Sequence, residues 1–171
     1  MSYNTKVYNE QGGAKRVVAD GGTIEVQNGG KIDAQSGSIV TGLVLNKRVR
    51  ATTAEVNAGL LILPQLAGYK YRIVDLTMIA IGGAAQTATS VDIVTTQGGS
   101  AARPFVVAVA ALTQSAIVKP NSANVTVLAD GASFVANDAN TGVYVSKQAA
   151  GSNLATATHI DVILSYMVEA A

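Results

Sequence analysis

The sequence predicts an all-β protein, with a short Gly-rich N-terminal stem, β-helical or extended, followed by an eight-stranded jelly-roll-like β-sandwich. Three observations lead to this fold class. Helical periodicity is hard to find along the 171 residues, short runs rich in Val, Ile, Thr and Tyr recur between turn-forming clusters, and glycines recur every eight residues near the N-terminus. We therefore expect an N-terminal arm over residues 1–20, a stem with a basic junction over 21–50, and the sandwich over 51–171.

The strand pattern supports the sandwich. The apolar runs, each bounded by turn residues, cover residues 55–63, 69–81, 90–95, 105–112, 115–119, 124–128, 142–146 and 158–168, with 133–138 as a further short candidate. In the last run Ile160, Val162 and Leu164 alternate with polar or mixed residues, which predicts one face in the core. Eight strands without helices are typical of two packed sheets, of which the jelly roll is the commonest eight-stranded form.

Two segments of the sandwich resemble each other. "TATSVDIV" (87–94) matches "TATHIDVI" (156–163), and Gly82 and Gly151 precede them at the same distance. An ancient duplication and the repeated use of similar hairpin chemistry both explain the match. Either way, Asp92 and Asp161 are predicted to occupy equivalent outward positions on two strands.

The stem is predicted from "GGTIEVQNGGKIDAQSGSIVTG" (21–42), where β-branched residues follow the repeated glycines. Its apolar face is too small to offset the conformational entropy of ordering the segment. We expect the segment to dock on its own sandwich or to wind with sister chains, most simply in a homotrimer. The predicted stem contacts are Ile24, Val26, Ile32, Ala34 and Val40.

Composition and charge limit the partners. Only 13% of residues are charged, against about 25% in ordinary domains, and the formal net charge is +1. This balance gives no reason to expect nucleic acid or an acidic membrane surface as a partner. No apolar run approaches the length of a membrane span, and cysteine is absent, so we expect synthesis as a soluble cytoplasmic protein without a disulfide framework. The basic group "NKRVR" (46–50) reads as a solvated junction or as a contact to an acidic protein surface.

The sequence offers little catalytic chemistry. His159 is the only histidine and shares a predicted strand face with Asp161, which is weak evidence for a triad. The acid pairs Glu25/Asp33 and Asp130/Asp138 match neither a calcium loop nor a glycosidase pair. We therefore predict no enzyme activity, no cofactor and no metal, with a cation held between subunits as a minor alternative.

A family resemblance rests on three stretches. Residues 56–94 and 127–169 resemble head decoration or head fibre proteins of tailed bacteriophages, and "GGTIEVQNGGKIDAQSG" (21–37) is similar to the stem repeats of phage fibres. The resemblance implies a homotrimer on the capsid surface of a virion, bound to the major capsid protein, with no enzymatic role. Under that hypothesis the candidate capsid contacts are Lys15, Arg16, Lys47, Arg48 and Arg50.

Two other readings remain open. The first is a tail fibre or receptor-binding protein, in which outer loops at 121–124 or 137–141 contact a host glycan. The second is a glycan-acting or proteolytic β-sandwich enzyme, which the lone histidine and the missing acid pairs disfavour.

Overall fold

The computed structural model describes residues 7–9, 16–19 and 42–171, and the chain divides into two compact units, Met1–Ser38 and Ile39–Ala171. In the first unit β1 (Val7–Asn9) pairs antiparallel with β2 (Arg16–Val18). The predicted stem contacts and one candidate capsid contact lie outside the described residues: Ile24, Val26, Ile32, Ala34, Val40 and Lys15.

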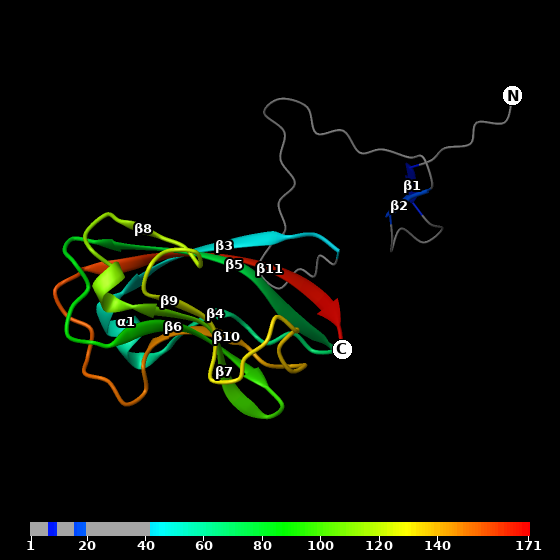
Figure 1. The fold of residues 1–171 in the computed structure, drawn as a ribbon. Coiled ribbons are helices and arrows are strands. Elements are labelled where there is room, and N and C mark those ends of the chain that lie inside the picture. Colours follow the sequence, from blue (N-terminus) through cyan, green and yellow to red (C-terminus); the bar gives the residue numbers. More distant parts are fainter. Residues whose placement is uncertain (1–6, 10–15, 20–41) are drawn as a thin grey trace, which may run out of the picture. The chain divides into compact units, whose positions relative to one another are not determined.

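The second unit is a β-sandwich of two antiparallel sheets, as Figure 1 shows. The four-stranded sheet has the order β3-β11-β5-β8, and the five-stranded sheet has the order β4-β10-β6-β7-β9. The strands are β3 (Leu45–Thr52), β4 (Leu60–Leu63), β5 (Tyr69–Ile81), β6 (Ser90–Gln97), β7 (Ser100–Ala108), β8 (Ile117–Val118), β9 (Val125–Ala129), β10 (Val143–Lys147) and β11 (His159–Ala170). The prediction of two sheets is confirmed, but this unit has nine strands rather than eight.

Part of the five-stranded sheet has Greek-key order. In space the order is β10-β6-β7-β9. Strands β6, β7 and β9 follow one another along the chain, apart from β8, which belongs to the other sheet. The next strand of this sheet, β10, returns to lie beside β6. Strands β6 and β7 form a hairpin through Gly98 and Gly99, which both have positive φ. These glycines tolerate the backbone twist that a tight hairpin requires.

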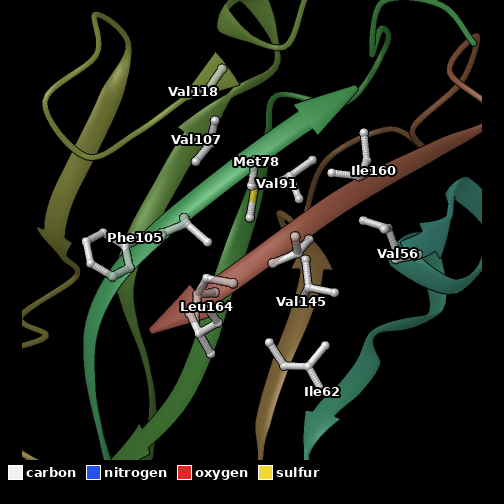
Figure 2. Close-up of a cluster of buried hydrophobic side chains, with 14 of the residues drawn as sticks. Val56, Ile62, Met78, Val91, Phe105, Val107, Val118, Val145, Ile160 and Leu164 are labelled. Carbon is white, nitrogen blue, oxygen red and sulfur yellow. The ribbon is translucent and has the colours of Figure 1, made fainter. Parts of the chain in front are cut away.

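The core lies between the two sheets (Figure 2). Met78, Ile160 and Leu164 from the four-stranded sheet pack in one cluster with Phe105 and Val145 from the five-stranded sheet, and all five side chains are almost fully buried. The predicted alternation along β11 is confirmed, since its core-facing residues are buried and the intervening residues lie on the other face. At roughly 1.5 to 3 kcal/mol per large apolar side chain, this interior is the main source of stability.

The two similar segments meet in space. Gln86 and Ala155, which are equivalent in the alignment of the segments, form an isolated antiparallel bridge with N–H···O distances of 3.2 and 3.0 Å. Thr87 and Thr156 both adopt positive φ, at 73° and 74°. The matched segments therefore share an unusual backbone conformation and run into β6 and β11, one strand in each sheet.

The prediction of a strand over residues 55–63 is wrong for the first half of that range. Thr53–Ala58 forms the helix α1, and only Leu60–Leu63 is a strand. A capping box explains the helix, because the Thr52 hydroxyl accepts from the Glu55 N–H while the Glu55 carboxylate accepts from the Thr52 N–H at 2.8 Å. Gly59, with φ of 85°, ends it.

Other predicted boundaries hold to within about two residues, except that β7 begins at Ser100, five residues before the predicted run 105–112. Run 69–81 coincides with β5, while the end of run 105–112 forms a 3₁₀ turn, Val109–Ala111. The short candidate at 133–138 is not a strand. The basic group at 46–50, predicted as a junction, lies instead in β3, where Leu45, Val49 and Ala51 face the core side.

Candidate functional site

The three basic candidates of β3 lie on an edge strand of the four-stranded sheet. Arg50 Nε donates to Asp161 Oδ1 at 2.8 Å, and its Nη2 donates to Oδ2 at 3.0 Å. Arg48 Nη2 adds a third bond to Oδ2 at 3.2 Å. Lys47 is exposed and pairs in register with Leu164. Two of the predicted capsid contacts therefore already hold an internal carboxylate, although their side chains remain 68% and 60% exposed for Arg48 and Arg50.

Asp161 is saturated with hydrogen bonds, because both of its carboxylate oxygens accept from arginines. The hydrogen bond from Arg50, supported by Arg48, lowers the pKa of the Asp161 carboxyl to about 2. The same bond raises the pKa of Arg50. A carboxylate that accepts three charge-assisted hydrogen bonds stays ionised and has little capacity left for another ligand.

The arrangement does not support the triad geometry that His159 and Asp161 suggest in sequence. Their Nε2 and Oδ1 atoms are 3.9 Å apart, which is longer than a hydrogen bond. His159 Nε2 is buried and has no hydrogen-bond partner within residues 42–171. Since both oxygens of Asp161 are held by arginines, this aspartate is not oriented to support a catalytic histidine.

The equivalent Asp92 on β6 has a different environment. Its Oδ2 lies 3.3 Å from Arg103 Nε, and the Arg103 Nη1 pairs with Asp130 Oδ2. Asp92 is only 1% exposed, and its Oδ1 has no hydrogen-bond partner among the described residues. Burial raises the pKa of the Asp92 carboxyl, against the opposing effects of Ser90 and Arg103. This carboxylate is therefore incompletely satisfied.

A β-bulge positions Arg103 beside Asp92. Between the register pairs Ile93↔Phe105 and Thr95↔Ala102, β7 advances by three residues while β6 advances by two. The extra residue breaks the alternation of faces along β7. As a result Arg103 lies next to the outward Asp92, although Phe105, two residues further on, is buried in the core.

Asp92 and Arg103 line a cavity of about 230 Å³ on the outer side of the five-stranded sheet. Its walls combine carboxylates, a guanidinium, a carboxamide and hydroxyls with small apolar side chains. The lining residues are Thr89, Ser90, Asp92, Arg103, Val106, Ala108, Thr126, Ala129, Asp130 and Gln148. The sequence indicated Asp92 through the repeat and Asp130 as a turn acid, but gave no signal that Arg103 joins them.

The loop predicted as a glycan contact at 137–141 is tied to the sandwich. Asn137 is 2% exposed, accepts from the Tyr71 N–H at 2.5 Å and donates to the Thr141 hydroxyl at 2.9 Å. The Asp138 carboxylate accepts from the N–H groups of Gly98 and Gly99 at 3.0 and 2.7 Å. The polar groups of the Asn137 and Asp138 side chains are therefore used mostly in hydrogen bonds that hold the loop in place.

Apolar side chains also reach the surface. Leu61 on the edge strand β4 lies directly opposite Tyr144 on β10, and the two are 45% and 40% exposed. Ile117 on the edge strand β8 of the other sheet is 64% exposed. Both sheets thus present exposed apolar residues at an edge. A partner chain that covered them would bury apolar surface and so stabilise the association.

Within the part of the chain that the structure describes, no group of three or more His, Cys, Asp or Glu side chains is arranged to hold a metal ion. No helix there is long and apolar enough to cross a membrane. Protein-family models, curated proteins and solved structures were all compared with the chain, and none matches.

Proposed function

We propose that the chain is a virion structural protein, a capsid decoration or head fibre protein that binds the major capsid protein on the outer capsid surface as a homotrimer. The observation that carries this proposal is the combination of a charge-poor β-sandwich with uncovered apolar residues on its edge strands, the pair Leu61/Tyr144 and Ile117. Such residues favour association with other chains. The role is non-enzymatic and needs no cofactor: symmetric binding adds buried area to the particle and strengthens it, or it displays the sandwich.

The basic edge supports the capsid contact. Arg48, Arg50 and Lys47 are exposed on β3, near the start of the described part of the sandwich. An arginine that is fixed by Asp161 on one side and open to solvent on the other is preorganised for an acidic partner surface. A jelly-roll-like description of the sandwich is part of this proposal, and the Greek-key order β10-β6-β7-β9 supports it.

Two measurements test the proposal. Light scattering should give the mass of three chains, and a monomeric mass would contradict the homotrimer. Incubation with undecorated phage heads, followed by pelleting, should co-sediment the protein. The charge-reversal variant Lys47→Glu should weaken co-sedimentation. Lys119→Glu is the matched control, because Lys119 directly follows β8, the edge strand of the same sheet opposite β3.

A truncation separates the two units. Since β3 begins at Leu45, deletion of residues 1–42 leaves every strand of the sandwich in place. We expect the truncated chain to stay folded and to lose trimer mass or capsid attachment. Collapse of the sandwich would show that residues 1–42 belong to its core.

The alternative is a tail fibre or receptor-binding protein, and the polar cavity at Asp92 favours it. Failure to co-sediment with heads at high protein excess would support this alternative over the capsid role.

A further inference from the structure

We propose that the cavity on the outer side of the five-stranded sheet is a binding site for a neutral sugar residue. This inference goes beyond the capsid role and does not depend on it. It starts from the chemistry of the walls, in which Asp92, Arg103 and Asp130 form one ion-pair chain across the cavity.

The charge of the walls selects the class of ligand. Two carboxylates and one guanidinium leave one formal negative charge, so an anionic ligand is repelled. A metal cation would meet the Arg103 guanidinium beside the carboxylates. Hydroxyl groups both donate and accept, and they are the groups that pair with carboxylate and guanidinium at once.

The oxygen of Asp92 that lacks a hydrogen-bond partner indicates a ligand that carries a hydrogen-bond donor. Asp92 is nearly fully buried, lines the cavity, and has an Oδ1 without a hydrogen-bond partner in the described part of the chain. A buried acceptor without a donor costs free energy. Oδ1 itself is buried, so a ligand hydroxyl reaches it only when the Asp92 carboxylate or a neighbouring wall side chain rotates, and the hydroxyl then supplies the missing donor. Thr126 and Gln148 offer further polar groups in the lining.

The size and lining also fit one sugar ring. The cavity measures about 230 Å³, enough for a single ring but not for a chain of several. Val106, Ala108 and Ala129 supply a small apolar part of the lining, but no aromatic side chain lines the cavity to stack on the ring. We therefore expect weak binding, with Kd on the order of 1 to 10 mM for one site, strengthened by avidity if several copies act together.

The test uses the full-length protein and four separate probes: glucose, galactose, mannose and N-acetylglucosamine. Amide chemical shifts are followed by NMR as each sugar is added to about 100 mM, well above the expected Kd. At least one sugar should shift the amides of residues 89–92, 103–108 and 126–130 in a saturable way. No saturable shift with any of the four, or shifts confined to another region, would overturn the proposal.

Three variants that should reduce binding, and one control variant, locate the binding. Thr126→Tyr fills the cavity from an exposed position on β9, so the fold should be kept while binding is abolished. Asp92→Asn and Arg103→Gln should each weaken binding by about tenfold or more, the loss of one charge-assisted hydrogen bond. Arg48→Gln, which removes an exposed arginine from the equivalent Asp161 site, should leave Kd unchanged.

Folding is checked in every variant from the dispersion of the same amide spectra. If folded Thr126→Tyr binds the sugar as the wild type does, the cavity is not the site and the proposal is overturned. Co-sedimentation with phage heads is measured separately, so a failure of the capsid role and a failure of the sugar site give different results.

Discussion

Asp92 and Asp161 stand at equivalent positions of two similar segments, yet their environments are opposite. Asp161 accepts three hydrogen bonds from Arg48 and Arg50, while Asp92 has one arginine and an oxygen without a partner. One strand motif has thus produced a closed structural ion pair on one sheet and an incompletely satisfied carboxylate beside a cavity on the other. The neighbouring strand, rather than the motif itself, decides which of the two roles an aspartate takes.

The largest effect should come from the glycines that precede the two segments. A Cβ added at Gly82, where φ is +76°, would lie 1.6 Å from Thr158 Oγ1, whereas one added at Gly151 meets no atom closer than 3.4 Å. We expect Gly82→Ala to lower the free energy of unfolding by about 3 kcal/mol, and Gly151→Ala by less than about 1 kcal/mol. Urea unfolding of both variants measures the difference.

The double variant Gly82→Ala/Thr158→Ala controls for the cause. Thr158→Ala removes Oγ1 and Cγ2, which an added Cβ would meet at 1.6 and 3.4 Å, but it keeps the Thr158 Cβ at 2.9 Å and the backbone strain at Gly82. Part of the lost stability should therefore return, but not all of it. Equal effects of Gly82→Ala and Gly151→Ala would show that the two turns are not distinguished by this contact.

The next effect concerns the saturated aspartate. Asp161→Asn should lower the free energy of unfolding at pH 7 by about 2 kcal/mol, because it weakens charge-assisted hydrogen bonds to two arginines. Asp75→Asn is the matched control on the same sheet, since Asp75 is exposed and its change should cost less than about 0.5 kcal/mol. Chemical denaturation of both variants tests this ordering.

The pH dependence of that contribution has a definite sign. The folded-state pKa of Asp161 is about 2, below the ordinary 3.8. The stabilisation is therefore complete above about pH 4 and is lost as the pH falls toward about 2. The free energy of unfolding of the wild type should decline across that window, and Asp161→Asn should show a shallower decline. Parallel curves would contradict the assignment.

The smallest predicted change has the opposite sign. Burial raises the pKa of Asp92, so its ionised form destabilises the fold above that pKa and the cost disappears below the ordinary value. Asp92→Asn should therefore be neutral or raise the free energy of unfolding at pH 7 by up to about 1 kcal/mol. The gain should vanish in acid, as denaturation at several pH values would measure. A clear loss of stability at pH 7 would mean that the Arg103 pair dominates.

Several features of the fold could be predicted from sequence because they repeat locally. Alternation along β11 identified Ile160, Val162 and Leu164 as core, and the segment match identified Asp92 and Asp161 as equivalent. The strand β3 was missed because its outward positions carry arginines, which read as a solvated junction. They are compatible with a strand because Asp161, more than 100 residues away, accepts from them.

The remaining features depend on contacts that no local pattern contains. The helix α1 had a readable signal, the Thr52/Glu55 capping box, which the apolar run after it concealed. The cavity had none, because Arg103 reaches Asp92 only through a β-bulge and meets Asp130 from a third strand end. A one-residue insertion in strand register reverses every side chain beyond it, and composition does not reveal where that happens.

The most direct test of the contrast is an NMR titration of the carboxyl carbons of Asp92 and Asp161 in the folded wild-type protein. The two environments predict a pKa of about 2 for Asp161 and a pKa above the ordinary 3.8 for Asp92. Two pKa values close to each other, or in the reverse order, would contradict the division into a saturated site and an open one.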